Sequence, residues 1–383
     1  MASSKRSRST TLDEATARPA RDPPSSSIRP PFLNSDKGFG RIPPELRLEI
    51  LSHFPSIDGT MAIPSGRRTG ERLSRKRRSE VVLVNGGVPL SYLERKDTLR
   101  ALSETCSDYR GIFHPILWES LDICFPARTP GSQTQPLEPF YKSIGEAMLR
   151  KCNGLLLNKD LAAMVWTVNV IFTRHKMEQS IPAFARCLRL MPNLQTVHVL
   201  DANPQMPKVI KSAFDSTVPL SSVRTVIIPG TCHELLKCCP GAETVWCNQG
   251  TGQKLVTVIR LYCKQVTEVR GFRCEENANA MKSLVNGIPN IEILELSAPL
   301  SEEVLGLLST LKQLSRVDII VPREGAELED VAIQRTIEGL RSILNKGSVT
   351  KERHLRVVPR PEALSASGAV TRRTTCVNAA STV

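Results

Sequence analysis

Several features are scarce or absent in this 383-residue sequence. Aromatic residues make up 4% of the chain. There is no apolar run of about eighteen residues, the length that a membrane-spanning helix needs. The first residues also lack the apolar stretch of a secretory signal. We therefore expect no membrane association and a location in the nucleus or the cytoplasm.

The motifs of common catalytic sites are missing as well. The six histidines do not have the spacing of metal ligands, and no Gly-x-Ser-x-Gly elbow is present. The segment Gly250-Thr251-Gly252 lacks the further residues of a phosphate-binding loop. Cys232 and His233 are adjacent and would point apart on a helix, which disfavours a nucleophile and its base. We expect a protein that is not an enzyme and uses no cofactor.

Cysteine, in contrast, is not scarce, since eleven cysteines occur at irregular spacings. No Cys-x-x-Cys pair occurs, although zinc sites normally take two ligands close together in sequence. One group is nevertheless concentrated in a single region, and consists of Cys232, Cys238, Cys239, Cys247, Cys263 and Cys274. The sequence favours reduced thiols that pack as small apolar side chains, and no metal site.

The net charge of +13 is unevenly distributed along the chain. Residues 1–40, 65–78 and 345–383 carry the excess, and the remainder is nearly neutral. Because nucleic-acid-binding domains carry basic residues on the folded surface, we do not expect binding to nucleic acid. The run Arg67–Arg78 fits either a nuclear-import signal or a solvated loop. Residues 1–39 and 361–383 are polar, and we expect both to be disordered tails.

Two stretches have the pattern of short amphipathic helices. The first begins with Pro43 and Pro44, which suit a first helical turn because proline lacks the N–H group that this turn leaves unpaired. Leu46, Ile50 and Phe54 then form an apolar stripe. The second stretch carries apolar residues at helical spacing, namely Leu99, Leu102, Cys106, Tyr109, Phe113, Ile116, Leu117 and Trp118. Two such helices cannot bury their stripes on each other alone.

In order and spacing, this segment resembles an F-box, with boundaries at residues 40 and 123. The resemblance implies docking on a Skp-type adaptor of a cullin ubiquitin ligase. It departs from the family at Tyr109, where a Trp is usual, and at a basic insertion, 55–96, where the connection is usually short. The implied adaptor-binding residues are Pro43, Pro44, Leu46, Ile50, Leu51, Leu102, Cys106, Tyr109, Leu117 and Trp118. The alternative is a pair of ordinary core helices.

After a linker and helix at 124–160, a repeat of the form apolar-x-x-apolar-x-apolar appears every 19 to 29 residues. Its copies start at Val165, Leu194, Val223, Ala242, Val266, Ile291 and Leu314, and the Val266 copy has Gly271 at its last position. Helix-like stretches separate the copies. One short strand and one helix per unit is the period of a leucine-rich repeat, which the region 161–360 resembles.

The sequence thus predicts an α/β fold, a small helical F-box followed by an irregular leucine-rich-repeat-like solenoid with a parallel sheet. A doubly wound α/β sheet is the alternative. Because strand residues alternate between faces, two rows should project away from the apolar side. In one of these rows we expect a target-binding site formed by His198, Ile227, Trp246 and Arg270, since an exposed Trp near an aliphatic and an Arg is typical of a binding hot spot.

These resemblances imply a substrate-recognition subunit of an SCF-type cullin E3 ubiquitin ligase. The F-box would bind the Skp-type adaptor and the ligase core, and the solenoid would bind an unknown target protein for ubiquitylation. Two alternatives remain open. The chain is a non-catalytic scaffold that uses the solenoid alone, or a nuclear protein that contacts nucleic acid through its basic segments.

Overall fold

The structure is a computed structural model that describes residues 42–53, 90–125, 137–215, 218–273, 278–321, 331–345, 353–359 and 375–378. The predicted tail 1–39 and the basic run Arg67–Arg78 lie outside these residues. Compact packing divides the chain between Arg47 and Leu48, within helix α1 (Pro44–Ser52). The sheet and its helices belong to the second part.

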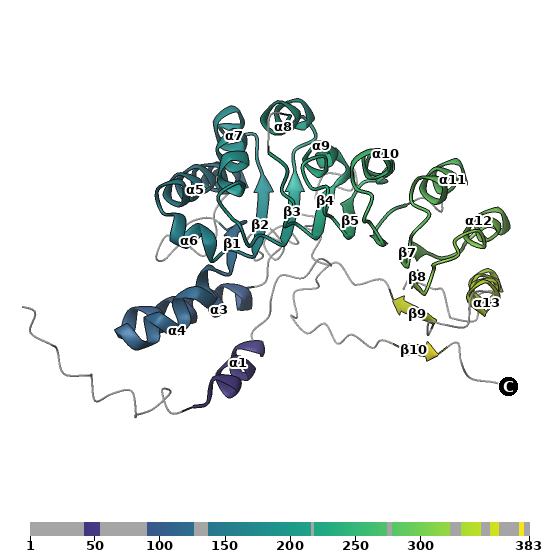
Figure 1. Cartoon of the computed structure of the whole chain (residues 1–383), viewed down its shortest axis with the longest axis horizontal. Helices are drawn as coiled ribbons and strands as arrows, with labels where there is room; N and C mark the ends of the chain where they lie inside the picture. The colour runs from purple at the N-terminus through teal and green to yellow at the C-terminus, as the bar shows by residue number, and fades with distance from the viewer. Residues whose placement is uncertain are drawn as a thin grey trace, which may run out of the picture. The chain divides into compact units, whose positions relative to one another are not determined.

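The strands of the described part form one sheet in which spatial order follows chain order from β1 to β10 (Figure 1). Neighbours from β1 to β9 are parallel, and β10 pairs antiparallel with β9. The strands are β1 (Ser120–Ile123), β2 (Thr167–Phe172), β3 (Thr196–Ala202), β4 (Thr225–Pro229), β5 (Thr244–Gln249), β6 (Glu268–Arg270), β7 (Ile293–Ser297), β8 (Arg316–Val321), β9 (His354–Pro359) and β10 (Thr375–Asn378). A doubly wound sheet reverses its strand order at a switch point, so this alternative is excluded.

Each crossover between parallel strands carries at least one helix, and these helices lie on one side of the sheet (Figure 1). They are α5 (Leu137–Leu157), α6 (Lys159–Ala163), α7 (Met177–Leu188), α8 (Pro207–Phe214), η3 (Gly230–Cys232), α9 (His233–Leu236), α10 (Gln253–Tyr262), α11 (Ala278–Gly287), α12 (Glu302–Leu308) and α13 (Val331–Asn345). Local signals set several starts. Asn158 and Ser301 cap α6 and α12, and Pro207 is the first residue of α8.

The main core lies between this helical layer and the sheet. Val168 and Val170 of β2 are buried in it together with Ile181 and Phe184 of α7, and the same alternation recurs along the sheet. Full burial of such a side chain contributes about 1.5–3 kcal/mol to the free energy of folding. The apolar residues of the repeat are therefore those through which each strand packs against its helix.

The opposite face of the sheet, which we call the second face, is contacted by helix α3 (Leu90–Thr105) at its first strands. Leu93 of α3 packs on a small apolar cluster that includes Ile171 and Leu200 of this face. The ammonium of Lys96 pairs with the carboxylate of Asp122 on β1 and donates to the carbonyl oxygen of Ser120 at 2.6 Å. Helix α3 and, after it, α4 (Ser107–Trp118) are thus attached to the start of the sheet.

The Asp122 carboxylate is buried at the centre of this attachment. The amide nitrogen of Asn169 donates to it at 2.7 Å, and the hydroxyl of Ser120 donates at 2.8 Å. Burial alone would raise the pKa of Asp122, but the ammonium of Lys96 and these hydrogen bonds hold the pKa below its ordinary value of 3.8. Lys151 of α5 donates to the carbonyl oxygen of the same residue.

Three boundaries differ from those predicted. Helix α3 begins at Leu90, inside the predicted insertion 55–96, and β1 lies inside the predicted F-box although it is a strand of the sheet. In the predicted C-terminal tail, β10 pairs with the edge strand β9. The repeat did not predict β1, β9 or β10, because these strands lie outside the copies that begin at Val165 and end with the Leu314 copy.

We expect Asp122→Asn to lower the free energy of unfolding by about 3 kcal/mol, because it leaves buried ammonium groups without a carboxylate. The contribution of the carboxylate should be complete above its ordinary pKa of 3.8 and should be lost as the pH falls, since its folded pKa is lowered. Urea denaturation measures both effects. Asp97→Asn, which removes an exposed ion pair with Arg100, is the matched control and should cost less than about 1 kcal/mol. Equal losses in both variants would contradict this assignment.

Candidate functional site

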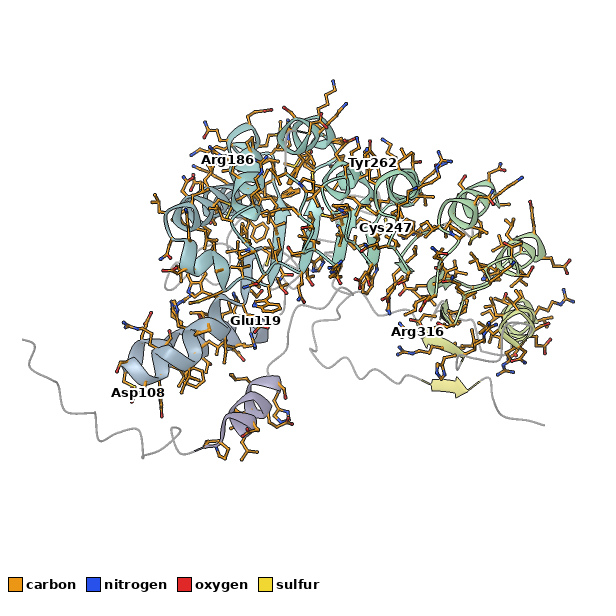
Figure 2. The ribbon with its side chains drawn as sticks, in the orientation of Figure 1. Asp108, Glu119, Arg186, Cys247, Tyr262 and Arg316 are labelled. Carbon is orange, nitrogen blue, oxygen red and sulfur yellow. The ribbon has the colours of Figure 1, made fainter. Side chains whose placement is uncertain are left out.

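The second face carries two rows of side chains that cross the strands. Paired residues connect the first row without a break, through Thr167, Thr196, Thr225, Thr244, Glu268, Ile293 and Arg316. The second row is paired from Asn169 through His198, Ile227 and Trp246 to Arg270, and again from Glu295 to Asp318. Figure 2 shows Arg316 on this face and Tyr262 of α10 on the helical side. The rows have the register that the sequence predicts.

Burial divides the four predicted target-binding residues. His198 and Ile227 are only 1% and 6% exposed, whereas Trp246 and Arg270 are partly exposed. The expectation that all four form an exposed group is therefore corrected. Sequence spacing gives the face on which a side chain lies but not what covers it, so this difference was not visible in the sequence. Trp246 and Arg270 are therefore the partly exposed members of this group.

Trp246 is closely surrounded by the residues at the end of β6. The guanidinium carbon of Arg270 lies 5.5 Å from the centre of the indole ring, within the range of a cation–π contact. Gly271 follows with a φ of +66°, and a Cβ atom placed there would lie 2.9 Å from the indole Nε1 atom. Glycine is required at this position both for its backbone angle and for the approach of the ring.

Arg270 also belongs to a closed set of ion pairs on β6 and β8, which we call the ion-pair ring. Its Nε donates to Glu268, and its Nη1 lies 3.7 Å from Oδ2 of Asp318. Arg316 closes the ring, with Nη2 3.7 Å from Oε1 of Glu268 and Nε 3.4 Å from Oδ1 of Asp318. All four side chains are at most 26% exposed, so solvent screens these pairs less than surface pairs. The sequence pattern predicts the position of these residues in the two rows but not their ion pairs.

Glu295 of β7 lies in the second row between Arg270 and Asp318. Its Oε1 accepts a hydrogen bond from the backbone N–H of Gly271 at 3.2 Å. Burial raises the pKa of the Glu295 carboxyl above its ordinary value of 4.5, against the opposing effect of the Arg270 guanidinium, while the Asp318 carboxylate adds to the rise. A partly buried acid thus completes the group of charged residues on this part of the face.

The F-box-like segment forms α1, α3 and α4. On α1, Leu46 and Ile50 are 54% and 41% exposed, whereas Leu51 is 4% exposed. Pro43 is exposed and Pro44 is the first helical residue. Phe54, the third member of the predicted stripe, lies outside the described residues. Two large apolar side chains of α1 are therefore directed to solvent.

The second half of this segment is not one continuous helix, because Cys106 separates α3 from α4. Its Sγ accepts a hydrogen bond from the backbone N–H of Tyr109 at 3.5 Å and caps α4. Of the other predicted adaptor-binding residues, Leu102, Tyr109, Leu117 and Trp118 are half-buried, and Cys106 is exposed. Trp118 packs against the main core, so at least this residue also has a structural role.

Helices α3 and α4 also enclose a shallow cleft of about 400 Å3. Its lining is formed by Arg100, Ser103, Glu104, Arg110, His114, Leu117 and Trp118. Two of the predicted adaptor-binding residues, Leu117 and Trp118, thus share a concave surface with basic side chains. The other predicted residues of this segment, Leu102, Cys106 and Tyr109, are not part of the cleft lining.

The cysteines of the 232–263 region are buried and unpaired with one another by disulfides. Burial raises the pKa of the Cys247 thiol to about 11 and that of Cys232 and Cys263 to about 12. These thiols are therefore protonated at neutral pH and are poor nucleophiles. Within the described ranges, no group of three or more His, Cys, Asp or Glu residues is placed to hold a metal ion. No helix in these ranges has the length and apolar character to cross a membrane.

We expect Glu295→Gln to raise the free energy of unfolding at pH 7, because the variant no longer buries a charge. Since the folded pKa of Glu295 is raised, the wild-type chain regains this stability below pH 4.5, where its carboxyl is protonated in both states. The difference between the two proteins should therefore shrink as the pH falls. Glu303→Gln on exposed α12 makes the same charge change and serves as the control. A variant less stable than wild type at pH 7 would show that the charge is needed there.

Comparison with known proteins does not assign the chain to a family. No known protein family matches the chain, and no curated protein matches it either. The function is therefore inferred from the described surfaces themselves, which are the exposed side of α1, the α3–α4 pair and the second face of the sheet.

Proposed function

We propose that the chain is a non-catalytic substrate-recognition subunit of an SCF-type cullin ubiquitin ligase. In this proposal the F-box-like helices bind a Skp-type adaptor, and the leucine-rich-repeat-like sheet binds a target protein. The observation that carries the proposal is the combination of an exposed apolar helix surface, at Leu46 and Ile50, with the F-box order of residues around it.

The exposed side of α1 supports the proposed binding to the adaptor. Leu46 and Ile50 are four residues apart and so lie on one side of the helix, with most or much of each side chain in solvent. Because about half of each side chain is already covered, burying the remainder on a partner would contribute about 1 kcal/mol each. These two exposed apolar side chains therefore favour a binding partner at α1. A Skp-type adaptor is the partner that the F-box resemblance implies.

The second face of the sheet supports the proposed binding to a target protein. Its middle strands present Trp246, with the hydroxyls of Thr225 and Thr244 in the adjacent row. Trp is enriched among residues that dominate binding energy at interfaces, because a large rigid ring loses little entropy when it is buried. The two surfaces lie on one chain, so binding at both would bring lysines of the target close to the ubiquitin-charged enzyme and raise their effective concentration.

Two alternatives remain in view, a scaffold that uses the sheet alone and a nuclear protein that contacts nucleic acid. The basic segments on which the second depends lie largely outside the described residues. A scaffold would retain its target but would not bind the adaptor, which makes adaptor binding the decisive measurement.

We expect Leu46→Asp with Ile50→Asp to abolish co-purification with a recombinant Skp-type adaptor, because the charges would prevent burial of this side of α1. Folding should be little affected, since both side chains are exposed in the free chain. Leu261→Asp on α10 is the matched control because Leu261 is 55% exposed, and this variant should bind the adaptor as wild type does. A folded double variant that still co-purifies at wild-type yield would exclude docking through α1.

We expect Trp246→Ala to weaken target capture by about 2 kcal/mol or more, the loss typical of an interface hot spot. Quantitative mass spectrometry of proteins retained by tagged wild-type and variant chains measures the loss. Trp166→Ala, which removes an exposed Trp at the start of β2, should retain the same proteins. If the folded Trp246 variant retains all of them, the target site lies elsewhere.

A further inference from the structure

Strand β6 forms the weakest junction of the parallel sheet. It has three residues, and only two of them, Glu268 and Val269, pair with β7. The strand ends here because Gly271 takes a left-handed angle, where the sequence repeat would otherwise continue with an apolar residue. In contrast, β7 and β8 pair over five residues from Ile293 to Ser297. The backbone ladder alone therefore gives little rigidity between β5 and β7.

The ion-pair ring spans this junction. Its ion pairs run from Glu268 on β6 to Arg316 on β8, and from Arg270 on β6 to Asp318 on β8. The strand between them, β7, pairs its Ile293 with both Glu268 and Arg316. Each of the four side chains contacts two others of opposite charge, so no single pair has to hold the connection. The ring therefore connects β6 to β8 across β7, at the place where the β6–β7 ladder has only two paired residues.

We propose that the ion-pair ring is a positioning device, which braces β6 across β7 to β8 and thereby holds Trp246 in one orientation for its partner. Arg270 is the link, because its guanidinium contacts Glu268, Asp318 and the indole ring at once. The planar fork of Arg suits several simultaneous contacts, which a Lys ammonium cannot reproduce. In this role Arg270 is a positioning residue and not a contact for the target. The inference rests on the proposed function only for the identity of the partner.

A third carboxyl group of this region, that of Glu295, also holds the loop after β6. Glu295 accepts the N–H of Gly271, and Gly271 lies against the indole of Trp246. The loop after β6 is thus fixed from β7 as well as through Arg270. Trp246 is held by groups that themselves have partners on β6, β7 and β8.

The test uses the variant Glu268→Gln with Arg316→Gln, which keeps the net charge and removes three of the four ring contacts. The chain has three Trp residues, so Trp118→Phe and Trp166→Phe leave Trp246 as the sole Trp, whose fluorescence is excited selectively over that of Tyr. We expect acrylamide to quench Trp246 more strongly in the variant. Amide hydrogen exchange at 268–270 and 293–295 should accelerate roughly five- to thirtyfold, with no change in β2 and β3.

The matched control is Arg224→Gln with Glu243→Gln. This pair is also charge-neutral, has a similar separation of 3.5 Å and lies at the start of β4 and β5, but its side chains are about half exposed. It should leave Trp246 quenching and exchange at β6 unchanged. The proposal is overturned if the ring variant is unchanged in both measurements, or if the control variant changes them equally.

A second variant covers the case in which the ring variant does not fold. Arg270→Lys keeps the charge but loses the fork, and it should increase Trp246 quenching while Glu268 and Arg316 remain paired. Unchanged quenching in Arg270→Lys would also overturn the proposal. Neither readout contains the target or the adaptor, so failure here is distinct from failure of the proposed function. Loss of target capture in Arg270→Lys with normal quenching would instead make Arg270 a direct contact.

Discussion

The whole sheet depends on one constraint, that a single short strand with its helix cannot bury its apolar side alone. Val168 and Val170 become buried only because β1 and β3 stand on either side and α7 lies across them. Each unit thus needs its neighbours, and the apolar positions must recur in register along the sheet. The same constraint places the residues between those positions on the second face, where the polar and aromatic side chains of both rows are found.

Periodicity alone therefore predicted the strands from β2 to β8, their register and the two rows of the second face. It could not predict which row members are exposed. His198 and Ile227 have the same spacing as Trp246, yet they are buried, because exposure depends on residues distant in sequence. The attachment of Lys96 to Asp122 was missed for the same reason, since the two residues belong to segments that sequence analysis assigned to an insertion and a helical domain.

This attachment gives α3 and α4 a defined relation to the sheet. Had α3 and α4 been joined to it only by a linker, their position relative to the second face would vary widely. Instead α3 packs on the apolar cluster at Ile171 and Leu200, and its Lys96 pairs with a buried carboxylate on β1. An adaptor bound to α4 would then stand in a fixed direction from the second face. Such a relation suits a protein whose proposed contribution is proximity.

An Arg beside a Trp is ambiguous by composition, because the same two residues serve equally as a binding hot spot or as internal packing. The partners of the Arg distinguish the two cases. The guanidinium of Arg270 already pairs with the carboxylates of Glu268 and Asp318. A target carboxylate that approached Arg270 would also approach these two carboxylates, and the repulsion between like charges would offset the gain. Trp246 has no such commitment of its exposed surface, so the binding energy of this face is expected to come from the indole, with the charged residues around it fixing its position.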